Sequence, residues 1–366
     1  MRFFACLLAL ILSACGNKAV SPVFYATENP ALLSDWGVVN IQDAELRLGE
    51  GVLPYSLNTP LFTDYAQKLR TIWMPEGTAR YREGDVFAFP IGTVISKTFY
   101  YPVGAGGAVL KVKEIQPVNI NAGLDLSQNR LIETRLLVRR EAGWEPLSYV
   151  WNEDETEAKL TRIGAIVKLT LDNQGEQTPF HYAVPNINQC AGCHAPNHTT
   201  RVMTPIGPKA THLNGDYDYG TETMNQLDKL IEVGYLNEAP IKRPRSAIWD
   251  NEAEPLEKRL RAYLDVNCAH CHNPVGPADT SGLHLNPENQ SRPHLGICKN
   301  AVAAGGGTGG RKYDITPGEP DNSSMLYRLE TRDPGAMMPE LGRSLTHAEG
   351  VELVEAWIAG MEGGCD

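Results

Sequence analysis

The stretch RLIETRLLVRREAGWEPLSYVW, residues 130–151, holds two runs rich in β-branched and aromatic residues, 130–139 and 144–151, separated near Gly143. Short runs of the same kind recur on both sides of it, with Gly, Pro and Asn between them: 68–74, 86–91, 93–101, 108–112, 163–171 and 180–184. Regularly spaced short strands with intervening turn residues are typical of a sandwich or barrel. We therefore predict a β-sandwich-like domain, of unknown role, over residues 16–184.

The composition changes at Pro185, where strand-like runs end and Asn, Gly, Pro and His become frequent. Residues 224–236 and 256–266 have the apolar spacing of amphipathic helices. A last helix is expected from Thr346, whose side chain would form a capping box with Glu349. Its buried face would consist of Val351, Val354, Trp357, Ile358 and Met361.

The N-terminus has the layout of a secretory signal. A cationic Met1-Arg2 start precedes an apolar run over residues 3–12, and the sequence Leu12-Ser13-Ala14-Cys15 follows. These four residues look like a bacterial lipobox, in which Cys15 is acylated after cleavage. The alternative is a plain signal peptide with an incidental Cys15. Gly16 favours the outer membrane over the inner one, so we expect a lipid-anchored protein on the periplasmic face of a bacterial membrane.

Charge and hydrophobicity argue against a nucleic-acid-binding protein and against a membrane span in the mature chain. The chain has 366 residues and a formal net charge of -11. Nucleic-acid binding requires clustered Lys and Arg, which this acidic chain lacks, so no nucleic-acid partner is expected. Beyond the first fifteen positions, no apolar run reaches the roughly eighteen residues of a membrane span.

Two Cys-x-x-Cys-His motifs carry the chemistry: Cys190-Ala191-Gly192-Cys193-His194 and Cys268-Ala269-His270-Cys271-His272. Two thiols three positions apart can form thioethers with the vinyl groups of one haem, and the adjacent His then binds the iron. The competing reading is one zinc site built from both Cys pairs. That reading leaves both trailing His residues unexplained and requires an unusually long spacing. The motifs therefore predict two covalently bound c-type haems.

The remaining cysteines fit an exported protein. Of eight Cys, Cys6 leaves with the signal and Cys15 is the lipidation candidate. Once the four motif cysteines are assigned, Cys298 and Cys365 are left over. A leftover pair in an oxidising compartment is most simply a disulfide, with two free thiols as the alternative.

The sixth iron ligands are less evident than the proximal ones. Residues 337–342, Met-Met-Pro-Glu-Leu-Gly, favour Met338 as the ligand opposite His272, with Met337 as its rival and core packing as the alternative for both. For the first haem the choice stays open between Met203, His212, Met224 and no ligand. We expect three other polar residues to be solvated, namely Asp64, Glu153 and Asp154, and His270 to face solvent.

Several segments together resemble a family of largely uncharacterised bacterial dihaem c-type cytochromes, many of them lipoproteins. The resemblance spans most of the mature chain and rests on these residues: 58–65 (NTPLFTDY), 89–93 (FPIGT), 130–135 (RLIETR), 149–152 (YVWN), 185–190 (PNINQC), 267–272 (NCAHCH) and 337–343 (MMPELGR). It implies two haems and redox work without a settled substrate. The C-terminal part, with a helix entering the motif and a later Met-Pro loop, also resembles a class I cytochrome c.

These observations predict an α+β multidomain chain. We expect a signal peptide and lipobox over residues 1–15, the β-rich domain over 16–184, and two mainly α-helical cytochrome c-like haem modules over 185–240 and 241–366. The expected function is electron transfer between periplasmic or membrane redox proteins. The alternatives are a dihaem peroxidase or oxidase with an open distal site on the first haem, and an electron-exit subunit for a dehydrogenase.

Overall fold

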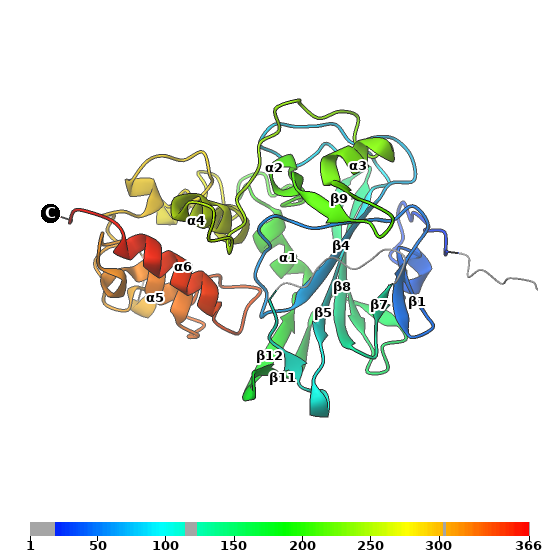
Figure 1. Cartoon of the computed structure of the whole chain (residues 1–366), viewed down its shortest axis with the longest axis horizontal. Coiled ribbons are helices and arrows are strands. Elements are labelled where there is room, and N and C mark those ends of the chain that lie inside the picture. The colour runs from blue at the N-terminus through cyan, green and yellow to red at the C-terminus, as the bar shows by residue number, and fades with distance from the viewer. Residues whose placement is uncertain (1–18, 114–122, 303–304, 366) are drawn as a thin grey trace, which may run out of the picture.

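The protein is built around a six-stranded antiparallel sheet. The computed structural model describes residues 19–113, 123–302 and 305–365. The sheet has the order β10-β9-β8-β5-β4-β3, and the stretch at 130–151 supplies its adjacent strands β8 and β9 (Figure 1). The strands are β3 (Leu53–Tyr55), β4 (Gln67–Trp73), β5 (Val94–Pro102), β8 (Asn129–Arg140), β9 (Gly143–Trp151) and β10 (Ala158–Thr161).

Three smaller sheets accompany it. The chain forms β1 (Val39–Gln42), β2 (Glu45–Leu48) and β7 (Leu124–Asp125) as one sheet, and β6 (Val109–Leu110), β11 (Ala165–Asn173) and β12 (Glu176–Val184) as another. The third is the two-stranded ribbon of β13 (Asp216–Asp218) and β14 (Thr223–Asn225). Because side chains alternate along a strand, each face of the main sheet has its own core.

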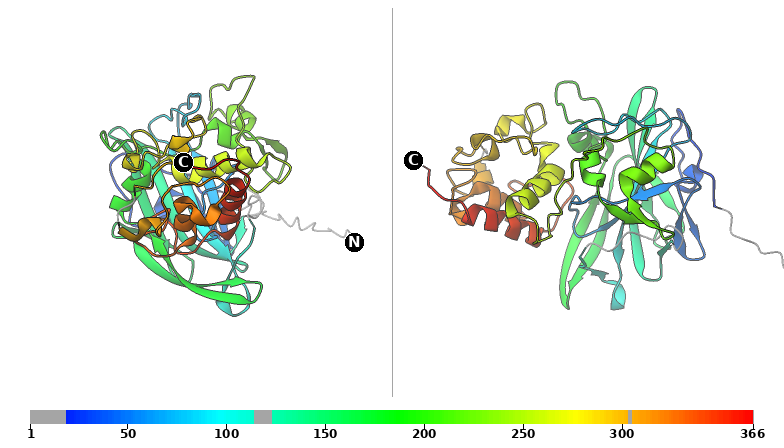
Figure 2. Two further views of the ribbon diagram at one scale, coloured as in Figure 1. Left: turned by 90° about the vertical axis from the view of Figure 1, so that its left-hand side faces the viewer. Right: turned by 45° about the horizontal axis from the view of Figure 1, so that its top comes forward.

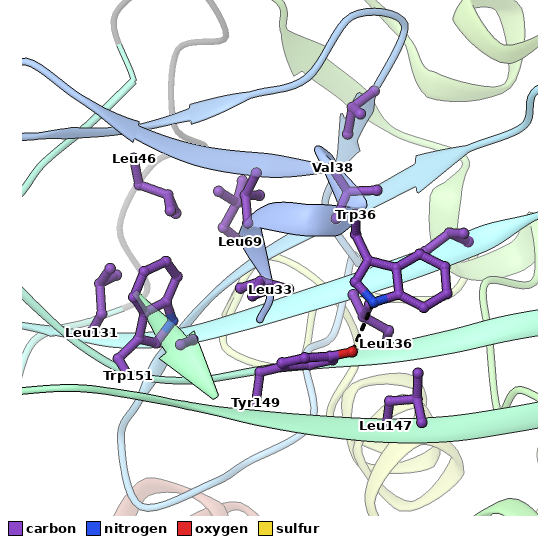
Figure 3. Packing of buried hydrophobic residues seen from close by; sticks show 14 of the residues in the cluster. Leu33, Trp36, Val38, Leu46, Leu69, Leu131, Leu136, Leu147, Tyr149 and Trp151 are labelled. Atoms are coloured by element: carbon purple, nitrogen blue, oxygen red, sulfur yellow. Dashed lines mark hydrogen bonds between the residues drawn. The ribbon is translucent and has the colours of Figure 1, made fainter. Parts of the chain in front are cut away.

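One face of the main sheet buries the largest apolar cluster, which includes Trp36, Leu136, Leu147, Tyr149 and Trp151 (Figure 3). Trp36 Nε1 donates a hydrogen bond to the Tyr149 hydroxyl at 2.7 Å, so the indole is buried without an unsatisfied donor. The opposite face carries two separate clusters. Ile72 and Ile95 pack with residues 210–236 near one end, while Phe99 and Tyr101 pack with β11 and β12 near the other.

Six α-helices occur in the described residues: α1 (Ile187–His194), α2 (Ala210–Leu213), α3 (Gln226–Glu232), α4 (Leu256–Leu264), α5 (Ser324–Glu330) and α6 (Ala348–Ala359). The helices α4, α5 and α6 surround a fourth apolar cluster that includes Leu260, Leu326 and Val354. Figures 1 and 2 show this group beside the sheet, with α1 between them. Cys298 and Cys365 are joined by a disulfide.

The expected fold class is wrong, because the described residues are sheet-rich and contain no pair of mainly helical cytochrome modules. Residues 185–240 hold three short helices and a ribbon, and their apolar side chains Leu213, Leu227 and Leu230 pack on the main sheet. Residues 241–366 hold three α-helices, and most of the described chain between them consists of single turns and irregular segments.

Three predictions of local structure, one strand, one helix length and one capping box, are wrong. Residues 86–91 form isolated bridges and no strand, and the helix expected at 224–236 is confined to α3. The capping box at Thr346 is absent. Thr346 Oγ1 donates to the Glu330 carbonyl, while Glu349 accepts from the Tyr65 hydroxyl. No helix among the described residues is long and apolar enough to cross a membrane, and Cys15 lies outside the described residues.

Candidate functional site at the two Cys-x-x-Cys-His motifs

The first motif lies on α1, whose start is fixed by a capping box. The Asn186 side chain accepts from the Gln189 backbone N–H, and the Gln189 side chain accepts from the Asn186 N–H, both at 2.9 Å. This arrangement satisfies two N–H groups that a helix start otherwise leaves unpaired. It holds Cys190 and Cys193 about one helical turn apart, and His194 ends the helix.

The imidazole of His194 is held in one tautomer. Its Nδ1 lies 3.0 Å from the carbonyl oxygen of Thr204, and the Thr204 N–H donates back to the His194 carbonyl at 2.7 Å. Because a carbonyl oxygen only accepts, Nδ1 carries the proton and Nε2 keeps its lone pair. Burial lowers the pKa of His194 to about 4, so the ring is neutral. A neutral imidazole oriented by a second hydrogen bond is the form that binds metals.

The second motif follows α4 through a short π-helix, Asp265–Ala269. The Nδ1 of His272 lies 3.0 Å from Ser281 Oγ, and Ser281 Oγ itself donates to the Ala278 carbonyl at 2.6 Å. Because the Ser281 hydroxyl proton is donated to the Ala278 carbonyl, the Ser281 oxygen accepts a hydrogen bond from His272 Nδ1–H. Burial lowers the pKa of His272 to about 4. Both motifs thus present a neutral imidazole with a free Nε2 lone pair.

The two motifs touch each other. Cys271 Sγ donates to the Gly192 carbonyl at 3.5 Å. The thiols of Cys193 and Cys271 are also hydrogen-bonded, which lowers the pKa of Cys193 and raises that of Cys271. Behind the first motif, the backbone N–H of His198 donates to the Val275 carbonyl at 2.8 Å. The fold therefore places two sites 78 positions apart in the chain (residues 193 and 271) side by side.

His270 belongs to the second motif and its side chain lies against Cys193 of the first, so the expectation of a solvent-facing side chain is wrong. Its imidazole hydrogen-bonds to Cys193, and its Nδ1 is buried without a partner in the described residues. The sequence contains no signal for this contact, because it depends on how the motifs pack.

Met338 lies outside all four apolar clusters of the described residues, whereas Met325 and Met361 pack in the C-terminal one. The residues after Met338 lie beside both motifs. A Cβ atom placed on Gly192 would be 3.1 Å from Leu341 Cδ1, and the Glu340 carboxylate is close enough to raise the Cys271 pKa. Met338 therefore has a position that core packing does not explain.

The three residues that could supply a sixth iron ligand at the first motif, His212, Met224 and Met203, each have different contacts in the structure. His212 is buried, and its Nε2 lies 2.7 Å from Asp265 Oδ2. Met224 lies on β14 and packs against the apolar cluster of the main sheet. Met203 directly precedes Thr204, the residue that orients His194. Two of the three side chains are thus engaged elsewhere, and the third lies next to the residue that holds the proximal imidazole.

A zinc site has no geometric support. Within residues 19–113, 123–302 and 305–365, no three His, Cys, Asp or Glu side chains are arranged to hold a metal ion. The four motif cysteines therefore do not form the tetrahedral set that structural zinc requires. A c-type haem would need two thiols and one imidazole from its own motif, and each of the two motifs supplies that set.

Asp64 is buried and not solvated, in contrast to Glu153 and Asp154, which are exposed. Its carboxylate accepts from the backbone N–H groups of Ser344 and Leu345, each at 2.7 Å. Burial raises the pKa of Asp64 to about 6 despite these bonds. Asp64 thereby fastens the loop before β4 to the segment that leads into α6.

Comparisons with protein-family models, curated proteins and solved structures give no match. The resemblance to dihaem cytochromes therefore stays a prediction from the residues quoted above.

Proposed function

We propose that this protein is a dihaem c-type cytochrome that transfers electrons between periplasmic or outer-membrane redox partners. The observation that carries the proposal is the shared geometry of the two motifs. Each has a cysteine pair and a partly buried, neutral imidazole whose Nδ1 is occupied by an oxygen acceptor, and the two motifs are in contact.

In this proposal each motif holds one haem. Cys190 and Cys193 form the thioethers of the first, and Cys268 and Cys271 those of the second. His194 and His272 would bind the irons through Nε2, and Met338 would be a further ligand to the iron held by His272. The haems supply one-electron exchange at iron. The chain contributes burial, fixed imidazole orientation and side-by-side attachment sites, which favour electron exchange between the two centres.

Partners and location follow from the N-terminal sequence. A lipid anchor on Cys15 would hold the protein on the periplasmic face of a bacterial membrane, with the outer membrane favoured. Redox encounters between proteins are generally small and transient. We therefore propose short-lived docking with periplasmic or membrane redox proteins.

One observation favours a second function, a peroxidase- or oxidase-type enzyme. The His212 Nε2 atom is bound to Asp265, and Met224 packs in the core of the sheet. The first haem would then lack two of its three candidate sixth ligands. An open distal face at that site would admit a small oxidant.

The experiment is to express the chain in a bacterium with a cytochrome c maturation system and to measure intact mass and optical spectra. We expect two covalent haems, with one lost in Cys190→Ala/Cys193→Ala and the other in Cys268→Ala/Cys271→Ala. A wild-type protein without covalent haem would overturn the proposal. Carbon monoxide then separates the two functions. Two low-spin haems indifferent to it support a carrier, and binding at the first haem supports the enzyme.

A further inference from the structure

The connection between α5 and α6, residues 331–347, carries Met338. It extends from the helical group toward α1 and the main sheet (Figure 1). The backbone N–H of Met338 donates a hydrogen bond to the carbonyl of Arg328 at 2.7 Å. Arg328 lies in the last turn of α5, so the backbone of the proposed iron ligand is fastened to the end of a helix.

Arg343 donates to the same carbonyl. Its side chain is buried, and its Nη2 atom donates to the carbonyls of Arg328 and Thr331, each at 3.0 Å. Its Nη1 atom donates to the carbonyl of Leu345 at 3.2 Å. A carbonyl oxygen has two lone pairs, so the Arg328 oxygen can accept from the Met338 N–H and from the guanidinium at once. Arg343 therefore holds the acceptor that holds Met338.

The residues after Arg343 are attached to the β-rich part of the chain. The Asp64 carboxylate accepts from the backbone N–H groups of Ser344 and Leu345, and it also lies within electrostatic reach of the Arg343 guanidinium. Asp64 and Tyr65 have φ angles of 47° and 64°, in the left-handed region that residues other than glycine rarely adopt. Such a conformation costs free energy and persists only where the surroundings enforce it. The contact between Asp64 and the connection is thus maintained against local backbone strain.

The anchored part of the connection lies beside the second motif. Burial lowers the pKa of His272, and the charge of Arg328 contributes to that shift. Two residues beyond Met338, the Glu340 carboxylate acts electrostatically on Cys271. Arg328, whose carbonyl fixes Met338, is therefore close to the imidazole that would hold the second iron.

We propose that Arg343 is a positioning residue for Met338, an inference that rests on the proposed function. Its guanidinium fixes the Arg328 carbonyl and so holds the thioether toward the iron that His272 would bind. Partners that orient a metal ligand in this way contribute to the strength of ligation without touching the metal. A planar guanidinium reaches several carbonyls in a fixed geometry, whereas the ammonium group of lysine is a single point charge.

The first test measures how firmly the thioether is held. Oxidised two-haem protein is titrated with free imidazole, which binds haem iron by displacing a weaker ligand, and the spectrum of the second haem is followed. Arg343→Lys keeps the positive charge and loses the fork. We expect it to lower the imidazole concentration at half-saturation about tenfold, as loss of one hydrogen bond from a charged group predicts. An unchanged half-saturation contradicts the proposal.

Two further variants separate positioning from charge and from general loosening. Arg343→Gln removes the charge as well and should shift the titration as Arg343→Lys does. A shift in the Gln variant alone would assign the effect to charge and overturn the proposal. Arg332→Lys is the matched control, because Arg332 is exposed and its Nε donates to the Ser344 carbonyl of the same connection at 3.0 Å. It should titrate as the wild type, and a shift equal to that of Arg343→Lys contradicts a specific role.

The decisive readout is the coupling between Arg343 and Met338. In a Met338→Ala protein no thioether remains to be positioned, so adding Arg343→Lys should leave the imidazole titration unchanged. A purely structural role of Arg343 would act in both backgrounds, and equal shifts in both overturn the proposal.

Failure of this inference is distinct from failure of the proposed function. Covalent haems are counted by mass before each titration, which tests the dihaem assignment by itself. If Met338→Ala titrates as the wild type, the ligand assignment is wrong and the positioning role falls with it. If Met338→Ala tightens imidazole binding and neither Arg343 variant does, the ligand assignment stands and only the positioning role is refuted.

Discussion

The Nε2 atom of His212 lies 2.7 Å from Oδ2 of Asp265, and both side chains are buried. His212 belongs to α2, which packs on the main sheet, and Asp265 opens the π-helix that enters the second motif. Lys209 Nζ lies 3.7 Å from the other carboxylate oxygen. The pair therefore joins the segment after the first motif to the helix before the second.

Replacing His212 by Asn should destabilise the fold and leave the first haem unchanged. Removing one partner of a buried hydrogen bond to a carboxylate costs about 2 kcal/mol, because the Asp265 oxygen loses that partner. Urea unfolding measures this loss, and His181→Asn, at an exposed position, is the control. If the first haem instead turns high-spin in His212→Asn, the imidazole is an iron ligand and its contact with Asp265 does not persist in the haem-bound protein.

Replacing Met338 by Ala should open the second haem. Met338 lies outside the apolar clusters of the described residues, so its loss should cost little stability while removing the thioether from iron. We expect a high-spin spectrum and carbon monoxide binding at that haem, and low-spin character restored by Met338→His. The matched control is Met337→Ala. The opposite pattern, with Met337 required and Met338 dispensable, would reassign the ligand.

Strand positions could be predicted from local sequence, whereas the surfaces that the helices cover could not. The runs at 68–74 and 93–101 correspond to β4 and β5, since β-branched and aromatic residues favour a pleated surface. The apolar stripe of residues 224–236 predicts that one face of this helix is buried, but it does not identify the surface on which that face packs. That partner is the main sheet together with the short helix α2, because Leu227 and Leu230 join the apolar cluster that includes Ile72 and Leu213. The prediction of a helical module failed for this reason.

The contacts between the motifs depend on long-range packing in the same way. His212 and Asp265 are 53 positions apart, and no sequence period relates them. Arg70, Lys97 and Arg135 lie on three separate strands, so their alignment across the sheet follows from strand register alone. The motif cysteines and histidines could be assigned from sequence because each motif is a single local segment.

Replacing Ser281 by Ala should raise the reduction potential of the second haem and leave the first unchanged. The Ser281 oxygen accepts the proton of His272 Nδ1, and such a bond makes the imidazole a stronger donor to the metal. Without it the oxidised iron is less stabilised. Ser281→Thr retains the hydroxyl and should retain the potential. Equal potentials in the wild-type and Ala proteins would contradict a role for this hydrogen bond.

Asp64 should make stability depend on pH in the opposite direction to most carboxylates. Burial raises its pKa to about 6 in the folded protein, against an ordinary value near 3.8, so the folded state binds more protons between about pH 4 and pH 6. Its contribution to stability therefore decreases as pH rises through this window, by about 2 kcal/mol. The measurement compares wild type with Asp64→Asn, which has no titrating group there, by urea unfolding at about pH 4 and about pH 7, on either side of that window. We expect the wild type to lose stability relative to the variant at the higher pH. A difference independent of pH would show that the bonds from Ser344 and Leu345 keep the carboxylate ionised throughout.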